Sequence, residues 1–427
     1  MRKLFIIILI TLPAFCYAQT KVVTRYLDQH NTIKEVYYTI DGDSALIHGA
    51  YVKYDLQGNS IITGYYEKGN RHGEFKNFYP NGQLQRVTYY VNGYREGETR
   101  VYNEPGVLIQ KGTFEKDVLV NVLTSYFANG EIKNETTFID GKPNGVVKEY
   151  FLSGKLKEEI AYLNGKQHGV NKTYYEETGK LRTEINYSNG VLDGLMRTYY
   201  SNGQLDTDAS QKNGTRNGSY IKYYENGQLK TSGKYAQGVL NGKITSYYPS
   251  GKIEKEVNVI GGKRVGLNKE FHENGTLKVS TNCSNNEKNR IIKAYDDKGN
   301  LLSEKYYVEN IKYGTWTFYF SNGKKQIEES YTFGKLDGTR TTYDNKGNKS
   351  REEKFQRGVR QGVERIFFSN GKLSELLTYR SNGLSGIYQK YSKPGVLEVE
   401  GQYKRNKKSG KWTFYDKKGT EINSENF

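Results

Sequence analysis

The chain has 427 residues, carries a formal net charge of +17 and is only 35% hydrophobic. This composition excludes two or three conventional domains built around aliphatic cores, and an aromatic content of 14% argues against disorder. The 47 glycines and 39 tyrosines favour strands and tight turns over helices. We therefore expect an ordered all-β protein with little aliphatic core.

Residues 1–18 have the layout of a secretory signal peptide. Arg2 and Lys3 form a basic start, Leu4 to Phe15 form an apolar stretch, and Ala18 offers a small residue at the cleavage point. The apolar stretch is too short to span a bilayer. The sequence thus predicts export to the periplasm, the cell surface or the medium. Cleavage lowers the net charge from +17 to +15, because the segment holds two positive charges and no negative one.

Cys16 permits a second interpretation, a lipoprotein with lipid attached to the cysteine at the cleavage point. Phe15 fits this alternative poorly, because a bulky residue stands where a small one is needed. Cleavage after Ala18 is therefore favoured, and it leaves Cys283 as the single cysteine, so the mature chain can form no internal disulfide. No later segment reaches the roughly eighteen apolar residues of a transmembrane helix.

Residues 19–45 repeat the later pattern imperfectly. His30 stands 28 residues before Gly58, and the extra length is filled by Asp41-Gly42-Asp43. Repeat arrays need an atypical end unit that shields the open edge of the sheet. We interpret 19–45 as such an N-terminal cap, and 46–427 as the repeat array.

A turn of the type Asn-Gly-x-Leu recurs throughout residues 46–427. Fourteen of the fifteen gaps between its glycines are 24 residues long, and one is 25, where Glu176-Glu177-Thr178 supplies an extra loop residue. A period of this length indicates a repeat architecture. The turn glycines stand at positions 58, 82, 106, 130, 154, 179, 203, 227, 251, 275, 299, 323, 347, 371, 395 and 419.

The residues around each turn glycine repeat as well. Leu or Ile stands two residues after it in twelve of sixteen copies, and an aromatic residue stands eight residues after it in twelve of the first fifteen. Both offsets are even, so in a strand these side chains share one face. An aromatic residue also stands four residues before the glycine in every copy: Tyr54, Phe78, Tyr102, Tyr126, Tyr150, Tyr175, Tyr199, Tyr223, Tyr247, Phe271, Tyr295, Tyr319, Tyr343, Phe367, Tyr391 and Tyr415.

A second turn is expected half a unit away, as in Gly69-x-x-x-Gly73 and Gly93-x-x-x-Gly97. Each unit is then a hairpin with strands of about five to seven residues, and neighbouring hairpins must pair because an isolated hairpin is barely stable. The predicted fold is an elongated, single-sheet array of about sixteen 24-residue β-hairpin repeats. The aromatic positions would line up from unit to unit as ladders.

Segments such as Tyr199–Leu205 (YYSNGQL) and Tyr223–Leu229 (YYENGQL) resemble the bacterial variant of the MORN (membrane occupation and recognition nexus) repeat. The resemblance covers 46–427. It implies an elongated β-hairpin sheet used for scaffolding and binding. The variant also occurs in proteins classed as antitoxins, and it implies no shared biochemical activity.

Cys283 takes the place where other copies carry an aromatic residue, eight after the glycine. A small buried filler is favoured there over a reactive thiol. His72 and His168 occupy equivalent turns 96 residues apart, too far to share a metal ion in an extended array. We expect all the histidines to be solvated turn residues: His30, His48, His72, His168 and His272.

Other motifs of site chemistry are incomplete. Asp41-Gly42-Asp43 lacks the further ligands of a calcium loop, and Gly165-Lys166 belongs to no complete phosphate loop. No serine stands in a nucleophile motif. We therefore predict no enzyme activity and no catalytic, cofactor-binding or metal-ligating residue. Residues 282–290 lack both glycines of the second turn, which leaves either a worn repeat or a bend or binding loop.

The function predicted from the sequence is an exported, non-enzymatic scaffold that binds a protein or a surface through a long Tyr/Gly-rich sheet face. The alternative is an antitoxin-like or immunity-like protein that sequesters a toxin, or a peripheral binder of anionic lipid or polysaccharide. The positive charge either keeps the sheet soluble or forms a basic binding face. Nucleic acid is the less favoured partner for an exported protein.

Overall fold

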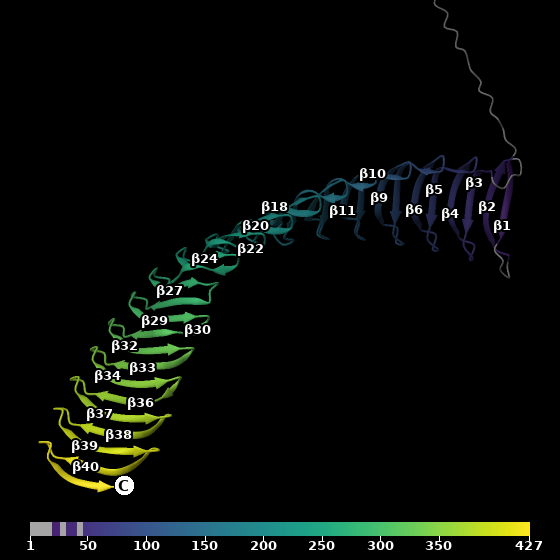
Figure 1. Ribbon diagram of the computed structural model, residues 1–427. Helices are drawn as coiled ribbons and strands as arrows, with labels where there is room; N and C mark the ends of the chain where they lie inside the picture. Colours follow the sequence, from purple (N-terminus) through teal and green to yellow (C-terminus); the bar gives the residue numbers. More distant parts are fainter. Residues whose placement is uncertain (1–18, 26–30, 41–45) are drawn as a thin grey trace, which may run out of the picture. The chain divides into compact units, whose positions relative to one another are not determined.

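The computed structural model describes residues 19–25, 31–40 and 46–427, so the predicted signal peptide, His30 and Asp41-Gly42-Asp43 lie outside the described residues (Figure 1). Every regular element of the described chain is a β-strand, and the 41 strands are assigned to one antiparallel sheet. This confirms the all-β hairpin-repeat prediction. The chain separates into two compact units, Met1–Gly203 and Gln204–Phe427.

In the first unit, the strands follow one another as an antiparallel meander, each hairpin pairing with the next. Their bounds are β1 (Gln19–Arg25), β2 (Ile33–Ile40), β3 (Ile47–Tyr54), β4 (Ser60–Glu67), β5 (Asn70–Phe78), β6 (Leu84–Val91), β7 (Tyr94–Arg95), β8 (Gly97–Tyr102), β9 (Leu108–Glu115), β10 (Val118–Tyr126), β11 (Ile132–Ile139), β12 (Lys142–Pro143), β13 (Gly145–Tyr150), β14 (Leu156–Leu163), β15 (Lys166–Gln167), β16 (Gly169–Tyr174), β17 (Leu181–Ser188) and β18 (Val191–Tyr199).

The second unit is a meander of the same kind. Its strands are β19 (Leu205–Lys212), β20 (Thr215–Tyr223), β21 (Leu229–Ala236), β22 (Val239–Leu240), β23 (Gly242–Tyr247), β24 (Ile253–Ile260), β25 (Lys263–Arg264), β26 (Gly266–Phe271), β27 (Leu277–Ser284), β28 (Asn289–Tyr295), β29 (Leu301–Val308), β30 (Ile311–Lys312), β31 (Gly314–Tyr319), β32 (Lys325–Thr332), β33 (Lys335–Tyr343), β34 (Lys349–Gln356), β35 (Val359–Arg360), β36 (Gly362–Phe367), β37 (Leu373–Arg380), β38 (Gly383–Tyr391), β39 (Leu397–Lys404), β40 (Lys407–Tyr415) and β41 (Glu421–Asn426).

The first turn of each unit is closed by a pair of backbone hydrogen bonds. The N–H of Tyr79 donates to Gln83 O (2.8 Å), and the N–H of Gly82 donates to Tyr79 O (2.9 Å). Gly82 has a φ of +83°, the conformation that a type I turn followed by a glycine bulge requires. The recurring glycine of the sequence is therefore the residue that closes this turn.

The second turn uses only the first of its two predicted glycines. Lys68 and Gly69 have φ of +47° and +83°, which makes a two-residue type I′ turn. Gly73 (φ +74°) lies inside β5, where the pairing with β4 shifts register, so it forms a bulge in the strand. The predicted second turn is therefore present, and the correction concerns its second glycine, which lies in the strand and not in the turn. In this copy the strands have eight and nine residues, longer than predicted. In copies such as β7 and β8 the second strand is split, and its longer part has six residues, as predicted.

The extra residue near position 177 also changes one aromatic assignment. In that copy the turn runs from Tyr175 to Lys180, one residue longer than elsewhere, and β16 ends at Tyr174. Tyr174 Oη donates to Glu159 (2.8 Å) just as Tyr150 Oη donates to the equivalent glutamate. Tyr174, and not Tyr175, is therefore the repeat equivalent of the last aromatic residue of the strand.

Residues 282–290 form a regular hairpin. β27 and β28 pair without a register shift, and the connection places Asn285 and Asn286 at positive φ without any glycine. Glu287 accepts hydrogen bonds from the N–H and Nε of Arg264 in the preceding hairpin, which anchors the turn. Of the two interpretations left open, the worn repeat agrees with this geometry. At the start of the chain, β1 pairs with β2 and β2 with β3, which continues the sheet.

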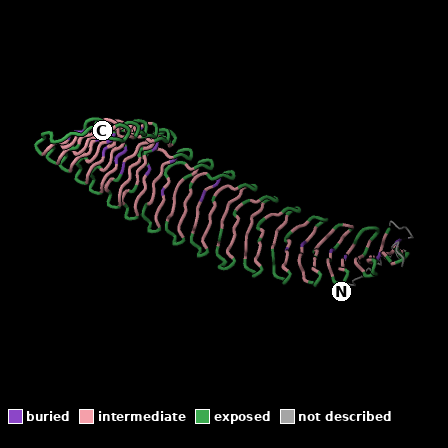
Figure 2. Tube along the Cα trace, turned by 90° about the horizontal axis from the view of Figure 1, so that it is seen from below, coloured by how far each residue is buried: buried purple, intermediate pink, exposed green. Residues whose placement is uncertain are grey.

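Hydrogen bonds along both edges tie each hairpin to the next. On one edge the N–H of Gly93 donates to Arg71 O (2.9 Å), and the same contact recurs from Gly238 to Arg216 (2.8 Å). On the other edge Tyr79 Oη donates to Tyr102 O (2.9 Å), a contact that recurs in later copies. Figure 2 shows exposed residues concentrated in the turns and partly buried residues along the strands.

Side chains alternate between two faces of each unit. We call the face that carries the residues two, four, six and eight after each turn glycine, and the residue seven before the next, the aromatic face. Phe75, Trp316 and Trp412 are buried there, each 5% exposed or less. The opposite face carries the last aromatic residue of each hairpin and the residue two before it, such as the buried Thr341. The predicted sharing of one face by the even offsets is thus confirmed.

Two strand glycines make room for large rings on the aromatic face. A Cβ atom on Gly401 would lie 2.3 Å from the Trp412 ring, and one on Gly64 would lie 2.5 Å from the Phe75 ring. We expect Gly401→Ala to lower the free energy of unfolding by about 1–3 kcal/mol, because the indole must leave its place. Urea unfolding followed by circular dichroism measures this.

Gly233 is the matched control, since it stands at the same repeat position. A Cβ there would lie 3.2 Å from the flexible Ile244 side chain. Gly233→Ala should be neutral, or stabilise the protein by up to about 1 kcal/mol through a less flexible unfolded chain. Equal losses in the two variants would contradict the ring-packing explanation.

Candidate functional site

Cations stack on rings along the aromatic face, between Tyr51 and Phe114 in the first unit and at several repeats of the second. In the first unit, the Arg71 guanidinium lies 5.3 Å from the ring centroids of both Phe75 and Tyr90, and Arg95 lies 4.1 Å from Phe114. Tyr51 and Tyr66 extend the row with centroids 5.3 Å apart. Such contacts contribute about 0.5–2 kcal/mol each. We call these residues and their equivalents in the second unit the cation–aromatic row.

In the second unit the row has the same composition. Lys312 lies 4.6 Å from the Trp316 ring and 4.8 Å from Tyr331, and Lys408 lies 4.4 Å from Trp412. The remaining members are Arg216 with Tyr220 and Tyr235, Arg290 with Tyr307, Arg360 with Tyr379, and the rings of Tyr388, Tyr403 and Phe427.

Most row cations occupy one repeat position, thirteen residues after the turn glycine. This position directly follows the type I′ turn and lies opposite the aromatic position across the hairpin, as in Tyr66–Arg71, Tyr90–Arg95 and Tyr403–Lys408. The short turn therefore fixes each cation beside the rings. The sequence prediction named the ring positions but missed the cations, although Arg or Lys at that position in Arg71, Arg95, Arg216, Arg264, Lys312, Arg360 and Lys408 carries the signal.

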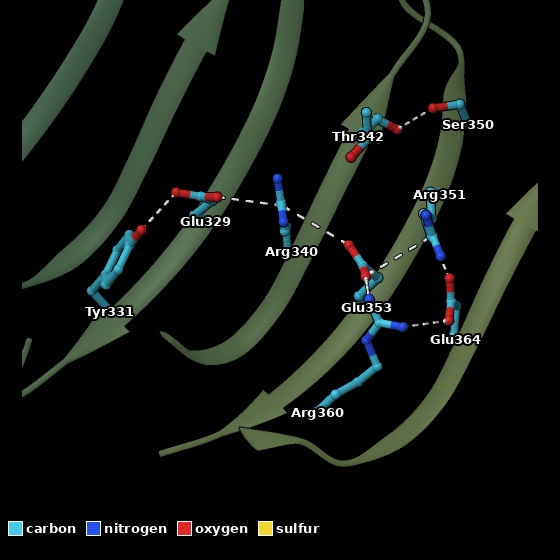
Figure 3. A network of polar contacts seen from close by, with 9 residues as sticks. All are labelled: Glu329, Tyr331, Arg340, Thr342, Ser350, Arg351, Glu353, Arg360 and Glu364. Atoms are coloured by element: carbon cyan, nitrogen blue, oxygen red, sulfur yellow. Dashed lines mark hydrogen bonds and ion pairs between the residues drawn. The ribbon is translucent and has the colours of Figure 1, made fainter. Parts of the chain in front are cut away.

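A cluster of charged residues interrupts the rings in the second unit (Figure 3). Glu353 and Glu364 are buried, with 3% and 1% of their surface exposed. Arg360 donates to both carboxylates, and Arg351 donates to Glu364. Each buried carboxylate thus has guanidinium partners, the condition under which a charge tolerates burial.

Arg340 extends the cluster toward the neighbouring strand. Its Nε lies 3.3 Å from Glu329 Oε1 and 3.9 Å from Glu353 Oε2, without hydrogen-bond geometry, so both contacts are electrostatic. Tyr331 Oη donates to Glu329 (2.7 Å), which joins the charged cluster to the row of rings. Three arginines and three glutamates balance within this network, and the sequence prediction did not identify it.

The opposite face carries pairs of a tyrosine and a glutamate fifteen residues earlier. Burial, and then the hydrogen bond to Glu159, raise the pKa of Tyr174 to about 12. For Tyr306 the hydrogen bond to Glu304 comes first and burial second, and its pKa is also raised to about 12. These phenols act as hydrogen-bond donors within a hairpin: Tyr174 links its two strands, and Tyr306 bonds to a neighbour on its own strand.

These tyrosines predict a loss of stability in alkali. Below about pH 10 both tyrosines are protonated in the folded and the unfolded chain. Between about pH 10 and 12 they lose their protons only in the unfolded chain. Because this ionisation stabilises the unfolded chain, the free energy of unfolding falls over that interval. The urea midpoint should fall across that interval. The urea midpoint of Tyr174→Phe should fall less steeply with pH than that of the parent protein. An identical slope would contradict the raised pKa of Tyr174.

Cys283 lies where the sequence placed it, on the aromatic face, and is 3% exposed. Burial raises the pKa of its thiol. A buried thiol with a raised pKa is a poor nucleophile. The position agrees with a small packing residue.

The described histidines act mainly as turn caps. His48 Nδ1 accepts from the N–H of Lys68 (3.3 Å), and His168 Nδ1 accepts from the N–H of Asn189 (3.4 Å). Asn217 makes the same kind of contact with the next turn. His72 lies 3.3 Å from Glu67, and His272 Nε2 contacts a backbone carbonyl. Across 19–25, 31–40 and 46–427, no three His, Cys, Asp or Glu side chains are grouped to hold a metal ion.

No helix in the described part of the chain is long and apolar enough to cross a membrane. No curated protein matches the chain. Among solved structures, TcdB2-TccC3 is 14% identical, with a TM-score of 0.15 and coverage of 92% of this chain and 23% of that one. A Tc holotoxin pore of Photorhabdus luminescens is 12% identical, with a TM-score of 0.14 and coverage of 93% and 26%.

The chain thus spans about a quarter of the length of these two structures. TM-scores this low establish no common fold, and no functional conclusion follows from them. The sequence profile of the MORN repeat variant matches nine segments: residues 71–92, 143–164, 167–189, 192–213, 216–237, 240–260, 264–282, 312–332 and 360–381. With their 24-residue hairpins in both units, these nine matches make the chain a MORN-repeat protein.

Proposed function

We propose that the chain is a non-enzymatic scaffold that binds a partner protein through the cation–aromatic row. The observation that carries this proposal is the recurrence of a cation over aromatic rings at one repeat position in both units. Aromatic residues and arginine are enriched at protein interfaces. A row that repeats lets many weak contacts act together on one extended partner.

Two matched variants test the role of the row. The first replaces five row cations with Gln: Arg71, Arg95, Arg216, Lys312 and Lys408. The second makes the same change at three arginines and two lysines of the opposite face: Lys76, Arg100, Lys148, Arg197 and Arg365. Each variant is used to capture partners from the native envelope and medium, and these are identified by mass spectrometry.

We expect the parent protein and the second variant to retain the same partner, and the first variant to lose it. Equal capture by both variants would contradict a role for the row. A captured toxin would identify the scaffold as an antitoxin-like or immunity-like protein. The absence of any enzyme activity is part of the proposal, because the repeated residues are accounted for by turns, strand faces and edge contacts.

Anionic lipid or acidic polysaccharide is the second candidate partner, and the net charge of +17 favours it. Sedimentation with phosphatidylserine vesicles tests the lipid. Binding that falls with salt and is lost only in the first variant would assign the row to lipid. Failure of the parent protein to sediment at low salt would exclude this role.

We also propose that the protein is exported by the signal peptide at 1–18. N-terminal sequencing of the protein recovered from the envelope or medium should begin at Gln19. Incorporation of labelled fatty acid with cleavage before Cys16 would instead establish the lipoprotein alternative. A protein that keeps Met1 and stays in the cytoplasm would contradict export.

A further inference from the structure

A hollow on the aromatic face of the first unit has an unbalanced charge. It has a volume of about 430 Å³, and its lining includes Arg71, Arg86 and Arg95 but no Asp or Glu. Arg86 has no ion-pair partner anywhere in the described ranges, and the hydrogen bonds of the Arg71 side chain go to the phenols of Tyr66 and Tyr90 (3.5 and 3.2 Å). Three guanidinium groups thus face a space without any carboxylate in its wall.

The second unit holds the same arrangement with carboxylates present. Arg86 and Arg95 stand four and thirteen residues after Gly82, and Arg351 and Arg360 stand at these offsets from Gly347. The pairing is equivalent too. Arg86 lies opposite Val101 and Arg351 opposite Ile366, while Arg95 and Arg360 each lie opposite an aromatic residue.

Two threonines replace the two buried glutamates. Thr88 stands at the repeat position of Glu353, and Thr99 at that of Glu364. Thr88 is 4% exposed, and the hydroxyl of Thr99 is a buried polar atom without a hydrogen-bond partner, although it lines the hollow. In the second unit the carboxylates at these positions bind both arginines (Figure 3). In the first unit the arginines remain and the carboxylates are missing.

Arg95 is the one arginine of the hollow with an acidic partner. Its Nε and Nη2 contact the Asp117 side chain and carbonyl, both at 3.0 Å. The Asp117 side chain is 47% exposed and belongs to the turn, outside the hollow. No acceptor among the described residues contacts Arg95 Nη1, so this atom remains able to bind a ligand. Arg86, Arg95 Nη1 and the Thr99 hydroxyl supply donors from β6, β7 and β8 along the wall of the hollow.

We propose that this hollow binds a pair of carboxylates supplied from outside, at the places that Glu353 and Glu364 fill in the second unit. The natural source is a partner segment with neighbouring Asp or Glu side chains, and only this identification rests on the proposed scaffold function. The chemistry itself is that of any small dicarboxylate. Planar guanidinium groups suit such ligands because they bind carboxylates in a bidentate manner.

The test is calorimetric titration of the full chain at low salt. The probes are glutarate and an acetylated, amidated tetraglutamate peptide, with the tetraglutamine peptide as the uncharged control. We expect both acidic probes to bind and the tetraglutamine peptide not to bind. Binding of glutarate without the acidic peptide would assign the site to small dicarboxylates. Binding of neither acidic probe with a Kd below about 10 mM would overturn the proposal.

Two variants locate the binding. Arg86→Gln should weaken the affinity for both acidic probes at least tenfold. The double variant Thr88→Glu/Thr99→Glu should do the same by a different route, because it recreates the filled network of the second unit. Arg100→Gln is the matched control, since Arg100 lies next to Val101 on β8 and points to the opposite face. It should leave affinity within about twofold, and an equal loss in Arg100→Gln and Arg86→Gln would refute a localised site.

Two further probes test the ligand class. Inorganic phosphate or polygalacturonate that binds more tightly than the acidic peptide, with the same dependence on Arg86, would overturn the assignment to acidic side chains. Circular dichroism of each variant checks folding. Because Arg86→Gln removes a cation and Thr88→Glu/Thr99→Glu adds carboxylates, the loss of binding does not depend on a single variant. Capture of no partner together with tight glutarate binding would count against the scaffold and support the pocket.

Discussion

Arg360→Met is expected to lower the free energy of unfolding by about 3–5 kcal/mol. The guanidinium of Arg360 contacts both Glu353 and Glu364, whose side chains are only 4% and 1% exposed. Methionine keeps much of the volume but removes the charge, so two buried carboxylates lose a shared partner. Breaking a buried ion pair on one side is costly because charge stays uncompensated, and here two buried carboxylates would be left to share Arg351. Urea unfolding and amide hydrogen exchange of β34–β36 measure the loss.

Arg365→Met is the control for this variant. Arg365 stands one residue after Glu364 on β36 and therefore points to the opposite face. Its replacement should change stability by no more than about 0.5 kcal/mol, the usual effect of a surface substitution. Equal effects of the two changes would show that the charged network contributes nothing specific. Faster exchange confined to β34–β36 in Arg360→Met would locate the damage in the network.

The sequence predicts the repeat because its signals are local. Gly82 must adopt positive φ for its turn to close, and strand alternation then places Leu84 and Tyr90 on one face whatever lies beyond the hairpin. The resemblance to the MORN repeat rests on these same residues, and nine matched segments confirm it. Local chemistry thus suffices for the fold class and the period.

Contacts across strands are harder to predict because they depend on register. A bulge such as the one at Gly73 shifts the pairing, so counting from the turn glycine does not tell which residues meet across strands. The contact of Arg360 with Glu353 and Glu364 joins three strands. The same limit explains the wrong choice of Tyr175 over Tyr174, since one added loop residue moves the count while the strand keeps its place.

Trp412→Ala is expected to lower the free energy of unfolding by about 3–5 kcal/mol, as for other buried tryptophans. Trp412 is 2% exposed, its Nε1 donates to Gln402 O (3.2 Å), and its ring lies over Gly401. Tyr388 stacks on it with centroids 5.4 Å apart. Alanine removes the ring that fills this space and leaves Gly401 uncovered. Trp412→Phe keeps a ring there, and its free energy of unfolding should fall by less than half as much as in Trp412→Ala.

The chain contains only two tryptophans, so in Trp412→Ala the fluorescence of Trp316 reports on its own repeats alone. Repeat arrays are stabilised mainly by contacts between neighbouring units, and damage should therefore stay local. The Trp316 unfolding midpoint should remain unchanged while amide exchange in β39–β41 accelerates. A Trp316 midpoint that falls with the loss at Trp412 would instead mean that these repeats unfold as one cooperative block. In that case the edge hydrogen bonds and the cation–aromatic row would couple hairpins over far more than the nearest neighbour.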